Sequence, residues 1–182
     1  MRNPTRSLLL TVVLALLVVA PSVRAAAGPP IPQPDVYTYY SLESFNMPGH
    51  FVRHRYALGE LTTVTTDLDR DDATWTLVPG LAGTGIALRS KNFPSYFLRH
   101  HAGRLTMDQS DGSALFREDA TFHLRPGNAA VGASWTSLES YNYPGHYVRH
   151  TGFHLWLTAD DGSTAFAEDS TWALEPPLAD LR

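Results

Sequence analysis

The chain has 182 residues, a formal net charge of −4 at pH 7 and no cysteine. Hydrophobic residues make up 43% of it and aromatic residues 11%, so it can bury a core, which excludes a disordered or fibrous chain. The acidic charge argues against binding to nucleic acid, because such binding needs a basic surface that displaces counterions. The length fits one ordinary domain, and without disulfides its stability must come from packing.

The first 25 residues have the pattern of a secretory signal peptide. Arg2 and Arg6 precede an apolar run at 8–20, and small residues follow at the cleavage position. As a helix that run would rise only about 20 Å, which is short of the roughly 30 Å hydrocarbon core of a membrane. We therefore expect a secreted protein with no membrane contact once residues 1–25 are removed.

A Pro-rich stretch separates this segment from the rest of the chain. Residues 28–34 read GPPIPQP, which cannot join a sheet ladder and favours an extended spacer. The sequence therefore predicts a linker at 26–38 and a single domain at 39–176.

Three copies of one unit follow, at residues 41–77, 87–124 and 137–174. Each copy has a turn with Asn and Pro, then an Arg-His pair, and later an Asp shortly before an aromatic residue. The His residues of successive copies are 46 and 50 positions apart and the Asp residues 47 and 50, so the two motifs keep step. These residues are His54, His100 and His150, and Asp72, Asp119 and Asp169.

Turn residues alternate with short runs of aromatic and β-branched residues in each copy. Residues 142–145 (NYPG) and 161–163 (DGS) are typical of turns, and the run at 147–150 (YVRH) between them is typical of a strand. No window after residue 25 has an apolar 3.6-residue period long enough for a surface helix. The sequence therefore predicts an all-β domain.

The number and size of the copies favour a β-trefoil with three pseudo-threefold repeats. Three units are too few for a propeller, and each is too small to bury a core alone, whereas closure around one axis removes exposed sheet edges. Six equivalent apolar residues are expected to face the core at its cap: Trp75, Leu77, Phe122, Leu124, Trp172 and Leu174.

Two strings in these copies resemble a known family. They read NYPGHYVRH at 142–150 and DGSALFREDATF at 111–122, and the likeness extends over about 39–174. The chain resembles the arabinose-binding β-trefoil domain of α-L-arabinofuranosidase B-type enzymes, carbohydrate-binding module family 42. The resemblance implies one shallow arabinofuranose pocket per lobe, formed by His54 with Asp72, His100 with Asp119, and His150 with Asp169. The first copy departs from the pattern, because it lacks the Asp-Gly-Ser turn and is one residue shorter between His and Asp.

These residue types suit a neutral polyol. An ionised carboxylate has about four lone-pair sites and can accept from two adjacent hydroxyls, and a neutral imidazole offers one donor and one acceptor. Aromatic rings can supply an apolar wall against the C–H groups of a sugar, and the candidates for that role are Tyr96, Tyr141 and Tyr147.

Other interpretations of the same residues remain. Each His and Asp can serve only local structure, by bonding loop carbonyls or backbone N–H groups. Glycoside hydrolysis needs two carboxylates that flank one bond, and Glu118-Asp119 or Glu168-Asp169 are poor candidates because neighbours on a strand point to opposite faces. A metal site at His50 with His54, or His146 with His150, is disfavoured because residues four apart on a strand lie about 13 Å apart.

The sequence thus predicts a secreted, monomeric, non-catalytic module that binds arabinofuranosyl side chains of arabinan or arabinoxylan and needs no metal or cofactor. Two alternatives stay open: an α-L-arabinofuranosidase, which is the activity implied by the resemblance, and a trefoil that binds a protein partner. Several weak sites would hold one branched polymer by avidity.

Overall fold

A computed structural model describes residues 34–129 and 134–181. Its elements follow one order three times, as strand, strand, strand, helix and strand. The first lobe contains β1 (Tyr39–Ser44), β2 (His50–Arg55), β3 (Leu58–Thr63), α1 (Asp67–Asp72) and β4 (Trp75–Pro79). The second contains β5 (Ile86–Ser90), β6 (Tyr96–His101), β7 (Arg104–Gln109), α2 (Ala114–Asp119) and β8 (Phe122–Pro126). The third contains β9 (Trp135–Ser140), β10 (His146–Thr151), β11 (His154–Ala159), α3 (Thr164–Asp169) and β12 (Trp172–Glu175).

The expected signal peptide at 1–25, and most of the linker expected at 26–38, lie outside the described residues. Within the part of the chain that is described, no helix has the length and apolar character needed to cross a membrane.

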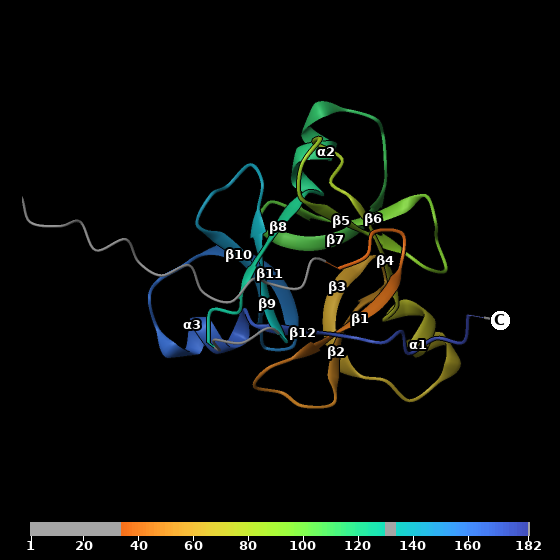
Figure 1. The fold of residues 1–182 in the computed structure, drawn as a ribbon, viewed down its shortest axis with the longest axis horizontal. Helices are drawn as coiled ribbons and strands as arrows, with labels where there is room; N and C mark the ends of the chain where they lie inside the picture. The colour runs from red at the N-terminus through yellow and green to blue at the C-terminus, as the bar shows by residue number, and fades with distance from the viewer. Residues whose placement is uncertain (1–33, 130–133, 182) are drawn as a thin grey trace, which may run out of the picture.

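The twelve strands form one antiparallel sheet that closes on itself. The first and last strands pair, with Leu42 opposite Leu174. The hairpins β2–β3, β6–β7 and β10–β11 meet one another, because β3, β7 and β11 pair in all three combinations. The all-β class is therefore confirmed, and the three helices lie at separate corners of the molecule (Figure 1).

Tight turns set the register of the three hairpins. In β10–β11, Thr151 lies opposite His154, so the loop consists of Gly152 and Phe153 alone. Both loop residues have positive φ, 58° and 66°, as a type I′ turn requires. The twist of such a turn matches the twist of the strands, which keeps each Arg-His pair in a defined place on its hairpin.

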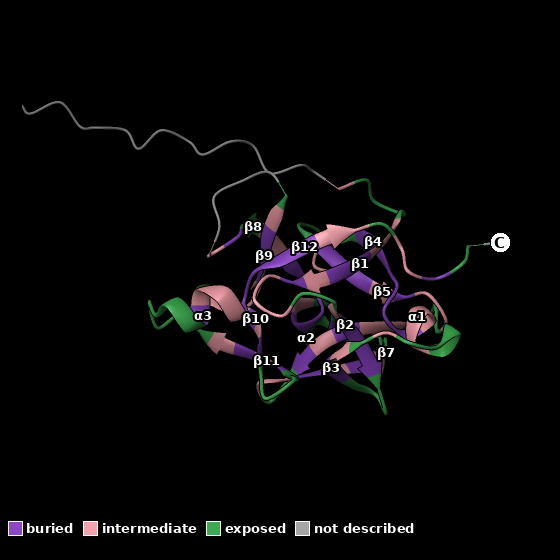
Figure 2. Ribbon diagram, turned by 90° about the horizontal axis from the view of Figure 1, so that it is seen from below, coloured by how far each residue is buried: buried purple, intermediate pink, exposed green. Residues whose placement is uncertain are grey.

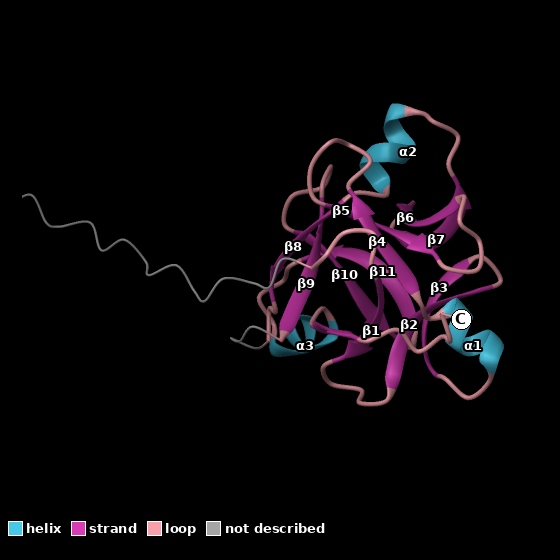
Figure 3. Cartoon of the chain, turned by 45° about the vertical axis from the view of Figure 1, so that its right-hand side comes forward, coloured by secondary structure: helices cyan, strands magenta, loops and turns pink. Residues whose placement is uncertain are grey.

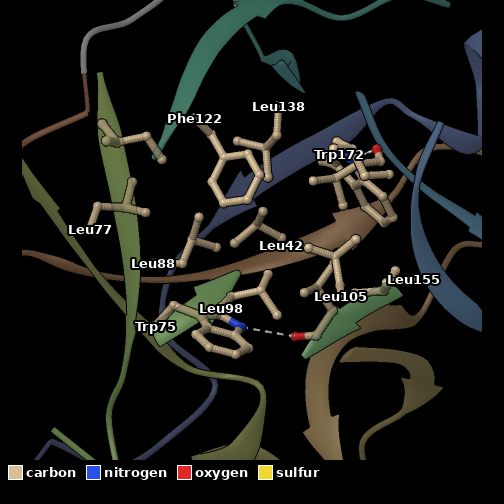
Figure 4. Close-up of a cluster of buried hydrophobic side chains, with 14 of the residues drawn as sticks. Leu42, Trp75, Leu77, Leu88, Leu98, Leu105, Phe122, Leu138, Leu155 and Trp172 are labelled. Atoms are coloured by element: carbon tan, nitrogen blue, oxygen red, sulfur yellow. Dashed lines mark hydrogen bonds between the residues drawn. The ribbon is translucent and has the colours of Figure 1, made fainter. Parts of the chain in front are cut away.

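The core lies inside the sheet and contains the apolar residues expected from the repeats. Trp75, Phe122 and Trp172 are fully buried with Leu77, and Leu124 and Leu174 pack against them from partly buried positions. The indole of Trp75 donates to the carbonyl of Val52 at 3.1 Å, so its polar atom is satisfied (Figure 4). Figure 2 shows that burial is concentrated in the strands and that the hairpin tips and helix starts are exposed.

The expectation that the domain has no helix was wrong, because each lobe has one helix of six residues (Figure 3). In α2 the hydroxyl of Ser113 accepts from the backbone N–H of Phe116 at 3.0 Å, and Ser163 caps α3 in the same way. The predicted Asp-Gly-Ser turns are the starts of these helices. Helices this short carry no full apolar period, so only the capping residue signals them.

The segment after β12 completes the pattern of loops between lobes. The backbone N–H of Ala179 donates to the hydroxyl of Thr74 at 3.1 Å. The loops before β5 and β9 make the same bond in the other lobes, from Ala82 to Thr121 and from Ala129 to Thr171. The C-terminal segment thus reaches the first lobe, where it ends beside α1 (Figure 1).

Candidate functional site

The fold brings each predicted His and Asp together. The distances between His Nε2 and Asp Oδ1 are 3.4 Å for His54–Asp72, 3.4 Å for His100–Asp119 and 3.5 Å for His150–Asp169. Each His lies near the end of the strand that opens a hairpin, and each Asp is the last residue of the helix that packs on that strand. Their side chains are mostly buried, with the Asp169 side chain the most accessible of the carboxylates at 16% exposure.

The helical position of the Asp residues corrects one step of the sequence analysis. Glu118 and Asp119 were expected on a strand, with side chains on opposite faces, but both lie at the end of α2. Successive helix residues are about 100° apart, so the two side chains still diverge. Asp119 is buried at the site, whereas Glu118 is partly exposed and lines a separate cavity.

The arginine of each Arg-His pair holds the carboxylate of its own lobe. The Nη2 atoms donate to the Asp Oδ2 atoms at 2.9 Å from Arg53, 2.8 Å from Arg99 and 2.6 Å from Arg149. Charge-assisted bonds of this kind favour the ionised carboxylate. Each site therefore contains a fixed negative group whose Oδ2 already has one donor.

An asparagine from another lobe completes each site. Its Nδ2 donates to Asp Oδ1 at 2.8 Å in all three sites, and its Oδ1 lies 2.8–3.0 Å from His Nε2. Asn92 serves the site of the first lobe, Asn142 the second and Asn46 the third. A serine two residues before each Asn donates to the same Oδ1: Ser44, Ser90 and Ser140.

Sequence reasoning treated these asparagines only as turn residues. The signal was present, because the string Ser-x-Asn-x-Pro recurs in all three copies, in step with the Arg-His pairs. What the sequence does not show is that the Asn reaches a site in the preceding lobe, or the last lobe in the case of Asn46.

Burial sets the charge state of two of the imidazoles. Desolvation lowers the pKa of His54, and the nearby guanidinium of Arg53 adds to this, against the opposing effect of the Asp72 carboxylate. Desolvation likewise lowers the pKa of His150, opposed by Asp169 and assisted by Arg149. Both rings are therefore neutral at pH 7, and each can act as one donor and one acceptor.

Comparison with known proteins places this arrangement in a family. A sequence profile of the alpha-L-arabinofuranosidase B (ABFB) domain matches residues 40–174, about three quarters of the chain. The chain belongs to the AbfB domain family. The family resemblance drawn from the two sequence strings is thereby confirmed, and with it the assignment to a carbohydrate-binding domain.

Individual relatives agree with the family. A probable α-L-arabinofuranosidase B of Aspergillus clavatus is 39% identical over 66 residues, which is 36% of this chain and 13% of the relative. The enzyme of Aspergillus kawachii is 36% identical over 93 residues, 46% of this chain and 18% of the relative. The chain therefore spans less than a fifth of the length of these enzymes.

A solved structure shows the same architecture. An arabinofuranosidase in complex with arabinofuranosyl-α-1,2-xylobiose superposes with a TM-score of 0.72 at 26% identity. The match covers 85% of this chain and 33% of that enzyme. The similarity is thus to one part of a larger enzyme.

The three tyrosines expected to form the apolar wall take different places in this AbfB domain. The ring of Tyr96 lies 5.8 Å from Phe93, whose ring lies 5.6 Å from His54. The ring of Tyr147 lies 6.1 Å from Phe166 on α3. Tyr141 lines a separate cavity of 350 Å³ with Arg117 and Glu118, away from the His100–Asp119 pair.

Buried Trp75 and Trp172 contact His54 and His150 edge-on from the core, and the exposed rings that make such contacts come from the Asn-Pro turns. Phe93 contacts His54 with ring centroids 5.6 Å apart, and Tyr143 contacts His100 at 5.2 Å. Phe93 and Tyr143 are about half exposed, at 46% and 51%. Each therefore offers an accessible ring beside the His of the preceding lobe, a role that the sequence analysis did not assign to them.

The first lobe of the AbfB domain has the largest cavity among those characterised in the described residues, with a volume of 680 Å³. His54 and Asp72 line it together with Arg53, Asp69 and Phe93. Small-molecule sites are commonly 300–1,000 Å³, so the cavity is large enough for a sugar residue. The lobe that departs most from the repeat pattern thus has a well-formed cavity.

The His pairs considered as metal ligands point to different surroundings. His50 Nδ1 lies 3.3 Å from the carbonyl of Pro48, and its ring lies 5.7 Å from Phe153, whereas His54 faces Asp72 and Asn92. In residues 34–129 and 134–181, no group of three or more His, Cys, Asp or Glu side chains is placed to hold a metal ion.

Proposed function

We propose that this AbfB domain is a β-trefoil that binds α-L-arabinofuranosyl side chains of arabinoxylan or arabinan at its three His–Asp–Asn clusters. The threefold order of elements and the meeting of the three hairpins support the trefoil assignment. The observation that carries the function is the contact of His54 and Asp72, 18 residues apart in sequence, in the wall of an open cavity. The signal peptide at 1–25, the linker at 26–38 and secretion remain part of the proposal.

The donors and acceptors at each cluster suit sugar hydroxyls. Of the roughly four lone-pair sites on a carboxylate, the Asn and Arg donors use two, so two remain for ligand O–H groups. The half-exposed ring of Phe93 can face the C–H side of a sugar in the first lobe. A neutral ligand suits this wall, because Arg53 and Arg55 balance the charges of Asp69 and Asp72.

Three sites on one domain favour binding to a branched polymer. Each site holds a single side-chain sugar weakly, and a polymer that reaches two or three sites is held more tightly through effective concentration. We therefore expect a large gain in affinity from a monosaccharide to arabinoxylan, with no gain for unsubstituted xylan.

Isothermal titration tests the proposal. Arabinoxylan is titrated into the native protein and into a His100→Ala, His150→Ala double variant. The matched control is His101→Ala, because His101 is exposed and follows His100 directly. The proposal predicts at least a tenfold loss of affinity in the double variant and less than a twofold change in the control. Equal affinities in all three proteins would contradict it.

We propose further that the domain binds without hydrolysing its ligand. In α2 and α3 the neighbouring carboxylates diverge, and one of each pair is engaged by Arg and Asn. An acid and base that flank one glycosidic bond need carboxylates about 5–9.5 Å apart on either side of it. The relatives are enzymes, so the decisive assay is release of 4-nitrophenol from 4-nitrophenyl α-L-arabinofuranoside. We expect no release of 4-nitrophenol above the rate in buffer alone. Release by the native protein that Glu118→Gln or Asp119→Asn abolishes would overturn the proposal that the domain does not hydrolyse its ligand.

A further inference from the structure

We propose that Asn46, Asn92 and Asn142 are positioning residues for the binding site of a different lobe, so that the three sites form a closed cycle around the domain. The inference deepens the proposed function and rests on it for the role of the ligand. Its geometric basis is independent, because it concerns which lobe supplies each part of a site.

The direction of each hydrogen bond follows from the carboxylate. In the third site the Asp169 carboxylate accepts from Arg149 at Oδ2, and the Asn46 atom 2.8 Å from its Oδ1 is the donor nitrogen. The amide oxygen of Asn46 then faces His150 Nε2 at 2.8 Å. An amide oxygen only accepts, so Nε2 must carry the imidazole proton.

The serine before each asparagine strengthens this assignment. Ser44 donates to the amide oxygen of Asn46 at 3.1 Å, so its single proton is already used. The distance from Ser44 Oγ to His150 Nε2 is 3.3 Å, and with the serine proton engaged, any bond there is donated by the imidazole. Both neighbours of Nε2 thus require the Nε2–H tautomer.

The consequence is a defined lone pair in each site. With the proton fixed on Nε2, the neutral ring of His150 has its lone pair on Nδ1. The hydrogen bonds of His54 and His150 in the described part of the chain are all made by Nε2, which leaves Nδ1 as an acceptor for a ligand hydroxyl. The asparagine therefore fixes the tautomer in which Nδ1 accepts a hydrogen bond. The imidazole then binds a ligand hydroxyl that donates its proton to Nδ1.

The asparagines act between lobes and not within them. Asn92 of the second lobe contacts His54 and Asp72 of the first, and Asn142 of the third contacts His100 and Asp119 of the second. Asn46 of the first lobe contacts the third and closes the cycle, across 123 positions of sequence to Asp169. A single lobe consequently lacks one part of its own site and supplies that part to its neighbour.

The test uses the imidazoles as reporters of their own sites. Nitrogen-15 NMR spectra of the full chain distinguish Nε2–H from Nδ1–H, and titration with methyl α-L-arabinofuranoside gives an affinity at each ring. We predict that Asn46→Ala disturbs the Nε2–H pattern of His150 and weakens binding there at least tenfold. His54 is in the same lobe as Asn46. Its Nε2–H pattern should stay unchanged, and the affinity there should change less than twofold.

A matched variant moves the effect by one lobe. Asn92→Ala should alter His54 and leave His100 unchanged. Asn46→Asp retains turn-forming chemistry but places a second carboxylate against Asp169, so it should give the same loss at His150 if Asn46→Ala does not fold. An Asn46 variant that alters His54 and spares His150 would overturn the proposal, as would an Nδ1–H tautomer in the native protein.

Failure of the proposed function has a different signature. If the native protein shows no shift of any imidazole with the arabinoside, the ligand assignment is wrong. The lobe-specific change of tautomer in the asparagine variants would still appear without ligand, so the positioning role is tested separately.

Discussion

Asp69 in α1 occupies the position that Phe116 occupies in α2, three residues before the carboxylate of the site in each case. In the second lobe the guanidinium of Arg99 lies over the Phe116 ring, 5.1 Å from its centroid. In the first lobe Arg53 forms an ion pair with Asp69 instead, and the cavity of 680 Å³ is next to both residues. In the first lobe the place of the aromatic ring is thus taken by a carboxylate that lines the cavity.

Asp69 should therefore matter for stability more than an ordinary surface carboxylate. Its side chain accepts from the backbone of Thr65 and Thr66, which together with Arg53 lowers its pKa well below the usual range, although desolvation opposes the shift. Asp69→Ala removes a capping box and one partner of Arg53, so we expect a loss of about 1–3 kcal/mol in the free energy of unfolding. Urea denaturation measures this.

Asp67 supplies the control for that experiment. It lies in the same helix and pairs with Arg70, but its side chain is 95% exposed. Exposed pairs contribute about 0–1 kcal/mol, so Asp67→Ala should have little effect. Equal losses in the free energy of unfolding for Asp69→Ala and Asp67→Ala would show that the helix cap and the ion pair with Arg53 do not stabilise the protein.

Stability should fall as the pH is lowered through the range in which His54 and His150 bind protons. The pKa of both residues is lowered in the folded protein by desolvation, so the unfolded chain binds protons first. Their contribution is complete above the unfolded value of about 6.5 and decreases as the pH falls toward the lower folded values. NMR titration of the two rings, with the denaturation midpoint followed in parallel, checks this. Folded rings that titrate at or above pH 6.5 would contradict it.

Arg104 should be important for the packing of the three hairpins. It donates to the carbonyls of Gly59 at 2.6 Å and of Leu155, and to the Glu60 carboxylate at 2.5 Å, so it joins all three lobes. Removing it takes a donor from both carbonyls and leaves Glu60 with His154 as its remaining partner, so we expect Arg104→Ala to cost about 2–4 kcal/mol in the free energy of unfolding. Arg125→Ala is the comparison, because Arg125 is 49% exposed and makes one ion pair. Its effect should stay below about 1 kcal/mol.

The segment after β12 should be needed for full stability although the family match ends at residue 174. Truncation after Glu175 removes the bonds from Leu178 to Ser41 and from Ala179 to Thr74. We expect a decrease of several degrees in the melting temperature, since a loss of 1 kcal/mol shifts that of a small domain by about 4 °C. Removal of residues 181 and 182 alone, which retains both bonds, should leave it nearly unchanged. Identical melting curves for the two truncations would contradict this.

The class of the fold was predicted from the repetition, and the pairing of His with Asp was implied by the family resemblance. Repetition indicates that two motifs in step at 46–50 residues occupy equivalent places in three lobes, and the core positions Trp75, Phe122 and Trp172 follow by the same argument. The short helices were missed, since six residues show no periodicity and only the capping residues Thr66, Ser113 and Ser163 signal them.

The asparagines were missed for a different physical reason. A turn residue such as Asn46 has an obvious local role, and nothing in the order of residues indicates which distant side chain it meets. That contact depends on how the lobes pack against one another, which places residue 46 against residue 169. The aromatic rings at 93 and 143 were assigned to turns for the same reason. Tyr141, which was expected in the apolar wall, lines a separate cavity.

The most direct test of the proposed function is a crystal of the domain soaked with methyl α-L-arabinofuranoside. We predict density for one furanose ring in the cavity of the first lobe, with its hydroxyls within about 3 Å of the Asp72 carboxylate and of His54 Nδ1. The equivalent positions at His100 and His150 should fill as the concentration rises. Sugar bound elsewhere, with all three clusters empty at saturating ligand, would contradict the account.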